Sequence, residues 1–246
     1  MKKTEKRMLA IWGSPGAGKS TTAVKLAWHY SRKEKQVALV FCDDQTPMLP
    51  CITREEELLR RCSLGSIFAA RRVIPDLVEA NQCRVKGAEF LHLYGFLKGE
   101  HAGMYPPLGM RQASELLACL CNRYDCVILD CSSDITHNLL SRMALEEADE
   151  VVRLLGCSLK SLSYYASQNS VLREMGIEER YFYRVVSNVK EEALAAKMYQ
   201  KTAFELPYSE ELNAQAQAGD LLREMEYKQS RTYLEHLTML AGELES

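Results

Sequence analysis

Several features that would place this sequence in other classes of protein are missing from it. No apolar run approaches the roughly 20 residues that a membrane-spanning helix requires. The net charge is −2 and no concentrated basic stripe is present, so we expect no specific nucleic-acid binding. None of the nine cysteines form a CxxC pair, the closest two being Cys119 and Cys121, which favours free structural thiols over a metal site. An odd cysteine count without a recognisable signal peptide is typical of a cytoplasmic protein.

Linkers, repeats and low-complexity tracts are also absent, so we expect a single domain over residues 1–246 with a short flexible lead at 1–7. Segments typical of buried strands alternate with segments of helical period. The sequence predicts strands at 8–12, 37–42, 90–94, 126–130, 149–155, 183–187 and 204–206, helices at 19–32, 55–61, 66–80 (broken at Pro75), 110–123, 158–174 and about 221–244, and a loop at 95–109. This alternation predicts a three-layer α/β fold, with a mostly parallel sheet and helices on both faces.

The most specific motif is the segment GSPGAGKST, which fits the phosphate-binding pattern GxxxxGK[ST] at every required position. It comprises Gly13, Ser14, Pro15, Gly16, Ala17, Gly18, Lys19, Ser20 and Thr21. The glycines allow backbone amides to wrap around a phosphate, and the helix that follows points its positive end at the same anion. Lys19 supplies a positive charge for the β- and γ-phosphates, Ser20 a hydroxyl for Mg²⁺, and Thr21 a contact to the α-phosphate.

Acidic residues follow two of the predicted buried strands. Asp43 comes after VALVFC, and Asp130 ends CVILD. Ligands of open parallel sheets lie at the carboxyl ends of the strands, and Mg²⁺ prefers oxygen ligands. We therefore predict a Mg²⁺ site formed by Ser20, Asp43 and Asp130, with Asp130 in the role of a Walker-B aspartate.

The order of these segments resembles that of the MinD/ParA-type P-loop ATPases, and within them the TadZ/CpaE-like proteins that position pilus or secretion machinery. The resemblance covers about residues 8–222 and rests on the phosphate loop followed by VALVFCDDQ, YDCVILDCSSD, ADEVVRLL, VVSNVK and ELPYSEEL. It implies binding of ATP or ADP with Mg²⁺, a nucleotide-dependent homodimer, and an assembly or secretion protein as partner.

Individual positions take roles from this resemblance. Asp43 matches the switch-I aspartate that orients the attacking water, so the resemblance implies that Lys19 and Asp43 are catalytic. Asp130 matches the Walker-B aspartate, and residues 131–134 match switch II. Asn188 matches the asparagine that recognises adenine, and Pro207 lies in the segment 206–208 that flanks the base.

Ser14 departs from the family pattern. The family has a second lysine just after the first glycine, which reaches across a nucleotide-sandwich dimer to the other protomer's phosphates, much as an arginine finger does. Phe41 also stands where many relatives have an aspartate, and the usual switch-II proline is missing after Asp130. Because groups that stabilise charge change phosphoryl-transfer rates by orders of magnitude, we predict retained nucleotide binding with slow or partner-stimulated hydrolysis.

Two other functions stay open on the sequence. A P-loop kinase of a nucleotide or small metabolite needs arginines near the transferred phosphate, for which Arg71, Arg72 and Arg111 are candidates. A scaffold that binds ATP without hydrolysing it is also compatible with Ser14. The segment 227–246 has helical period but few basic residues, so we expect a helix docked on the core or on a partner, with membrane contact that is at most peripheral.

Overall fold

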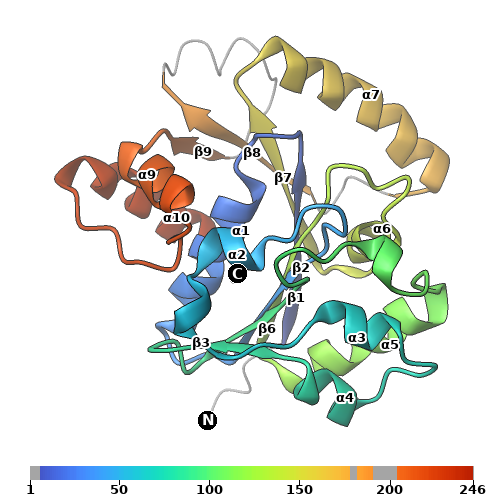
Figure 1. Cartoon of the computed structure of the whole chain (residues 1–246). Helices are drawn as coiled ribbons and strands as arrows, with labels where there is room; N and C mark the ends of the chain where they lie inside the picture. Colours follow the sequence, from blue (N-terminus) through green and yellow to red (C-terminus); the bar gives the residue numbers. More distant parts are fainter. Residues whose placement is uncertain (1–5, 178–181, 191–203, 246) are drawn as a thin grey trace.

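Nine strands form one sheet in the computed structural model of the protein, which describes residues 6–177, 182–190 and 204–245 (Figure 1). The strand order is β3-β4-β5-β2-β6-β1-β7-β8-β9. Only the β3–β4 and β4–β5 pairs are antiparallel, which confirms the predicted mostly parallel sheet. The strands are β1 (Arg7–Gly13), β2 (Val37–Phe41), β3 (Leu58–Arg60), β4 (Cys83–Val85), β5 (Leu91–Tyr94), β6 (Cys126–Asp130), β7 (Glu150–Gly156), β8 (Phe182–Val189) and β9 (Phe204–Pro207).

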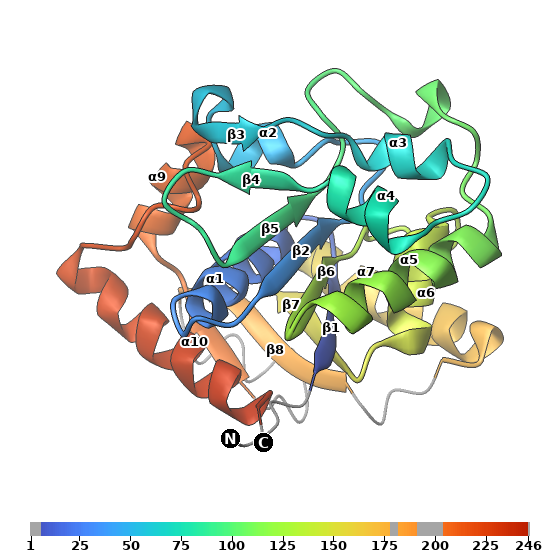
Figure 2. The ribbon, with the colours of Figure 1, turned by 90° about the horizontal axis from the view of Figure 1, so that it is seen from below.

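Helices cover both faces of this sheet. Figure 2 shows α1 and α10 on one face and α5 and α6 on the other. The α-helices are α1 (Lys19–Ser31), α2 (Leu49–Ile52), α3 (Leu64–Phe68), α4 (Pro75–Ala80), α5 (Met110–Arg123), α6 (Leu139–Glu147), α7 (Leu159–Met175), α9 (Glu210–Ala218) and α10 (Arg231–Glu243), and short 3₁₀ turns are η1 (Glu55–Glu57), η2 (Ala102–Met104) and η4 (Lys228–Ser230).

The central strand β1 supplies side chains to two hydrophobic cores, one on each face. Leu9 and Ile11 pack into the core shared with α1 and α10, whereas Ala10 and Trp12 pack into the core shared with α5 and α6. All four are at most 1 % exposed. A strand with both faces buried has a continuous run of apolar residues rather than an alternating pattern. This is why β1 could be predicted from the sequence. The sheet therefore fixes the end of β1, where the phosphate loop begins.

Three predicted segments in the first half of the chain differ from the structure. The predicted helix at 55–61 is the turn η1 followed by the edge strand β3. The predicted helix at 66–80 is two helices, α3 and α4, of which the second begins at Pro75, where proline is well tolerated because the first helical residue needs no N–H partner. The predicted lead at 1–7 lies outside the described residues except for its last two, and Arg7 already pairs with Cys126 in the sheet.

The sequence predicted that the C-terminal helix begins at about Leu221, but in the structure it begins at Arg231. Side chains from other helices hold the backbone before it. Lys25 of α1 donates to the carbonyl of Arg223 at 2.8 Å, and the Glu211 carboxylate accepts the N–H groups of Glu226 and Tyr227 at 2.6 and 3.1 Å. In this segment, these long-range hydrogen bonds take the place of the backbone hydrogen bonds of a helix. The local hydrophobic period of the sequence could not predict them.

Lys25 should make the stability of the protein depend on pH. The residue is 3 % exposed, and its ammonium also donates to Gln215 at 2.7 Å. Burial lowers the pKa of Lys25 to about 8, and the negative charges of Glu211 and Asp220 oppose this effect. Between pH 8 and the ordinary value of about 10.5, the folded chain then binds fewer protons than the unfolded chain, so its stability rises with pH.

We therefore expect the free energy of unfolding of wild type, measured relative to Lys25→Met, to rise between pH 8 and 10, by at most about 1.4 kcal/mol per pH unit. Denaturant titrations of both proteins at pH 7, 8, 9 and 10 would test this. A difference that is constant or falls over this range would show that Lys25 is not held in this buried position.

No helix in the described part of the chain is long and apolar enough to cross a membrane.

Candidate functional site

The predicted phosphate loop joins β1 to α1 and has the backbone that such a loop needs. Gly13, Gly16 and Gly18 have φ angles of 156°, 75° and 79°, values that residues with a side chain rarely adopt. At Gly13 a Cβ atom would lie 2.1 Å from the carbonyl oxygen of Leu154 on β7. Glycine is therefore required at this position both for its backbone angle and for the close approach of two strands.

Side chains from two neighbouring segments hold the loop. Ser187 of β8 donates from its hydroxyl to the carbonyl of Ala17, and Ser133, after β6, donates to the carbonyl of Gly13 at 2.9 Å. The loop closes on itself through the Ala17 N–H and the Ser14 carbonyl at 3.1 Å. Helix α1 then begins at Lys19 with no side-chain cap and no acid in its first turn, so its amino end is left to attract an anion.

Lys19 lies inside this arrangement. Its Nζ donates to the Ser133 hydroxyl at 2.6 Å and to the Ser14 carbonyl at 3.4 Å. Burial lowers the pKa of Lys19, and the negative charges of Asp130 and Asp43 oppose that effect. The ammonium is thus held between the loop and the two predicted acids.

Asp130 ends β6, and Asp43 follows β2, the neighbouring strand of the sheet. Asp130 pairs in register with Phe41 at the end of β2, and Asp43 follows two residues later. Asp130 is 3 % exposed. Burial raises its pKa to about 7, with Asp43 adding to the rise and Ser20 and Lys19 opposing it.

These residues fit a Mg²⁺ ion that accompanies a bound phosphate. The Oδ1 atom of Asp130 is buried and has no hydrogen-bond partner among the described residues, and the Ser20 side chain lies close to the Asp130 carboxyl group. A buried carboxylate oxygen without a donor is costly unless a cation completes it. Asp43 is more exposed, and its Oδ1 accepts the N–H groups of Gln45 and Thr46 at 3.0 and 2.9 Å.

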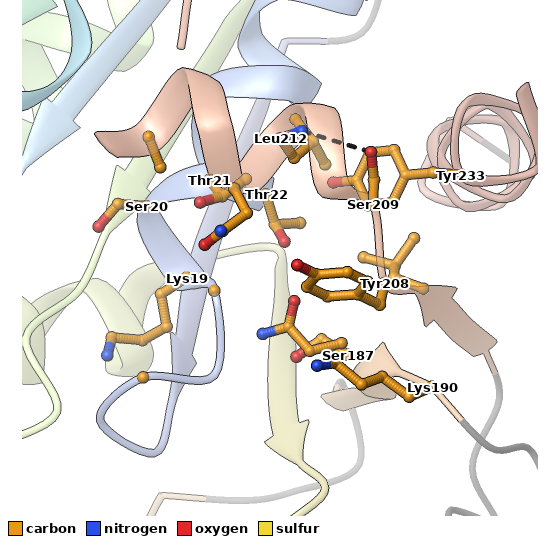
Figure 3. Close-up of a pocket in the computed structure, with 16 residues that line it drawn as sticks. Lys19, Ser20, Thr21, Thr22, Ser187, Lys190, Tyr208, Ser209, Leu212 and Tyr233 are labelled. Atoms are coloured by element: carbon orange, nitrogen blue, oxygen red, sulfur yellow. Dashed lines mark hydrogen bonds between the residues drawn. The ribbon is translucent and has the colours of Figure 1, made fainter. Parts of the chain in front are cut away.

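A cavity of about 510 Å³ opens beside the first turn of α1 (Figure 3). Asn188, at a φ of 57°, lies at its edge with its side-chain amide near Gly18. The wall is polar toward the loop and partly apolar toward α9 and α10. The lining residues are Gly16, Gly18, Lys19, Ser20, Thr21, Thr22, Ser187, Asn188, Lys190, Leu206, Tyr208, Ser209, Leu212, Asn213, Ala216 and Tyr233.

Some of the predicted binding residues do not line this cavity. Pro207 is absent from its wall, although its neighbours Leu206 and Tyr208 belong to it, because successive residues of a strand point to opposite sides. Pro15 lines an adjacent cavity of about 410 Å³. Ser14 is 3 % exposed and faces Gly156, and its hydroxyl has no hydrogen-bond partner in the part of the chain that the structure describes.

Four other residues of the site were not predicted individually: Ser133 and Tyr208 lie in the predicted switch-II and base-flanking segments, and Ser187 and Lys190 had no predicted role. Ser133 and Ser187 hold the loop, and Lys190 and Tyr208 line the cavity with the Lys190 Nζ 4.4 Å from the centre of the Tyr208 ring. Serines in strands and turns are too common to signal such roles. Lys190 follows an irregular end of β8, where Asn188 has a positive φ and the pairing with β9 shifts in register, so the period of the strand does not predict its direction.

An open, mostly parallel sheet with this loop between β1 and α1 is the fold of the P-loop NTPases. A family model described as an AAA domain matches residues 9–172, more than half of the chain, so the chain belongs to this family. No curated protein matches the chain.

Solved structures with the same fold are MinD and ParA ATPases. The cell division ATPase MinD of Pyrococcus furiosus is 17% identical, with 97% of this chain and 98% of that chain covered and a TM-score of 0.72. MinD of Pyrococcus horikoshii OT3, solved with Mg-ADP, is 15% identical, with coverages of 97% and 96% and a TM-score of 0.73. A ParA family ATPase of Chlorobium tepidum TLS is 15% identical, with coverages of 98% and 100% and a TM-score of 0.76. The chain therefore has the MinD/ParA type of P-loop NTPase fold.

Proposed function

We propose that this protein binds ATP and ADP with Mg²⁺ and acts as a slow or partner-stimulated ATPase that positions or assembles a cellular machine. The observation that carries this proposal is one arrangement: the phosphate loop and Lys19 line a cavity of about 510 Å³, and the buried Asp130 lies close enough to Lys19 for each charge to affect the pKa of the other. The Mg-ADP bound to one protein of the same fold supports it. We place the protein in the cytoplasm.

Each residue of the site has a role in this proposal. The loop amides and Lys19 bind the phosphates, and Asn188 binds the adenine. Ser20, Asp43 and Asp130 would hold Mg²⁺, which when bound neutralises charge on the phosphate oxygens. Asp43, whose carboxylate is partly exposed, orients the attacking water.

We also propose a nucleotide-dependent homodimer and an assembly or secretion protein as partner, by analogy with the TadZ/CpaE-like proteins. Support for a partner comes from one relative in fold, the MinD cell division protein of Aquifex aeolicus, solved in complex with MinC.

The arginines that a kinase would need do not lie at the cavity. Arg72 and Arg111 both pair with Glu115 of α5, at 2.8 and 3.0 Å, and neither they nor Arg71 line the cavity. The scaffold alternative keeps its support, because Ser14 is uncharged and buried. Binding of ATP without turnover, even in the presence of a partner, would favour it.

Restoring a lysine at position 14 tests the proposed cause of slow hydrolysis. We expect Ser14→Lys to raise ATP turnover at least about tenfold and to favour a dimer with ATP, because it supplies charge to the transferred phosphate. Turnover and size by light scattering would be measured for wild type, Ser14→Lys and the matched variant Ser14→Met, which is long but uncharged. Equal turnover in all three proteins would show that the residue at position 14 does not limit hydrolysis.

A further inference from the structure

Lys190 places a second cation at the cavity, besides Lys19. It follows β8, and Figure 3 shows its side chain running below Tyr208 toward the phosphate loop. Among the described residues that line the cavity, Lys19 and Lys190 are the only charged ones. The wall therefore carries two positive charges and no carboxylate, which is the electrostatic character that a polyphosphate requires.

The charge of Lys190 is not neutralised within the described part of the chain. Its Nζ lies over the Tyr208 ring, 4.4 Å from the centre, and the side chain is exposed. A cation–π contact at an exposed site is weak. Lys19, by contrast, faces both Asp130 and Asp43. The two lysines thus differ within the described part of the chain: acids of the site balance Lys19, whereas no described carboxylate pairs with Lys190.

Lys190 also lies close to the start of the phosphate loop. Gly16, Asn188 and Lys190 line both the 510 Å³ cavity and the adjacent cavity of about 410 Å³, whose wall includes Pro15. Ser14 is buried next to Pro15 and carries no charge. Lys190 therefore borders the same part of the loop where the residue at position 14 provides no cation.

We propose that Lys190 binds the phosphate chain of the nucleotide and supplies part of the positive charge that Ser14 cannot. The inference rests on the proposed binding of ATP. On binding, the ammonium leaves the Tyr208 ring and donates to phosphate oxygens, because charge-assisted hydrogen bonds are stronger than an exposed cation–π contact. The ring face of Tyr208 is then free to stack on the base. Lys190 becomes a phosphate ligand that does not belong to the loop motif.

The test compares nucleotides that differ in their number of phosphates. Dissociation constants for Mg-ATP, Mg-ADP and AMP would be measured by calorimetry for wild type, Lys190→Met, Lys190→Arg and the control Lys160→Met, an exposed lysine on α7. We expect Lys190→Met to weaken ATP binding about tenfold, as for loss of one charge-assisted contact, and AMP binding less than twofold. The dissociation constant of Lys190→Arg for Mg-ATP should stay within about threefold of the wild-type value, and that of Lys160→Met should equal the wild-type value.

Three results would overturn the inference. Equal losses for ATP and AMP would mean that Lys190 acts through the base or the fold, and unchanged ATP binding in Lys190→Met would mean that it does not touch phosphate. If Lys160→Met lost as much affinity for Mg-ATP as Lys190→Met, the effect would come from the overall charge of the protein and not from a contact of Lys190 with phosphate. Wild type that binds none of the three nucleotides would instead reject the proposed function itself.

Discussion

Replacing Lys19 with methionine should weaken Mg-ATP binding at least about 30-fold while the protein stays folded. Truncating one partner of a buried, hydrogen-bonded charge pair costs roughly 2–5 kcal/mol, and each 1.4 kcal/mol is about a tenfold change in affinity. The ammonium lies between the loop carbonyl of Ser14 and the Ser133 hydroxyl. Methionine keeps most of the side-chain volume, and Ser133 still donates to Gly13 in its absence.

Calorimetric titration of Lys19→Met with Mg-ATP would measure this effect, beside Lys160→Met as an exposed lysine whose loss should be neutral. Thermal unfolding of both variants would show that the fold is retained. A dissociation constant for Lys19→Met within about threefold of wild type would mean that the loop does not bind phosphate.

Replacing Gly13 with alanine should destabilise the protein by about 3–5 kcal/mol, because overpacking and backbone strain each cost roughly 1–3 kcal/mol. The added Cβ would lie 2.1 Å from the Leu154 carbonyl oxygen, and the φ angle of Gly13 is 156°. Neither β1 nor β7 can easily move, since both are central in the sheet. For a chain of this size, the melting temperature should fall by about 10 °C.

Gly87→Ala provides the matched control for this prediction. Gly87 also has a positive φ, 76°, but a Cβ there would have nothing within 4 Å. Its replacement should cost only the conformational strain, about 1–2 kcal/mol. If denaturant unfolding showed that both variants lose the same free energy of unfolding, a Cβ at position 13 would not clash with β7, and the close approach of β1 and β7 there would be disproved.

The phosphate loop and the two acids could be predicted because their signals are local. A buried strand, a glycine-rich turn and a helix follow one another within 24 residues, from Met8 to Ser31, and the sheet then brings the ends of neighbouring parallel strands together. Asp130 and Asp43 meet for this reason alone. The resemblance named the segment 206–208 without the side to which each side chain points, and in the structure Leu206 and Tyr208 line the cavity whereas Pro207 does not.

The residues that hold the site together were harder to predict. Ser133 and Ser187 act on the loop from segments more than 100 residues away, and no spacing in the sequence connects them to it. Helix α6 was not among the predicted helices, although its sequence has a local signal: Asn138 caps it by accepting the Ser141 N–H at 2.8 Å. Short elements such as β4 depend on pairing with their neighbours rather than on their own period.

The central claim is that the cavity beside α1 binds a purine nucleotide with its phosphates in the loop at 13–21. Titration of wild-type protein with a non-hydrolysable ATP analogue and Mg²⁺, followed by a crystal structure of the complex, tests it most directly. We predict one nucleotide per chain, with the triphosphate against the loop amides and Lys19 and the base beside Asn188. Absence of binding at millimolar nucleotide, or a nucleotide bound elsewhere with the loop empty, would contradict the account.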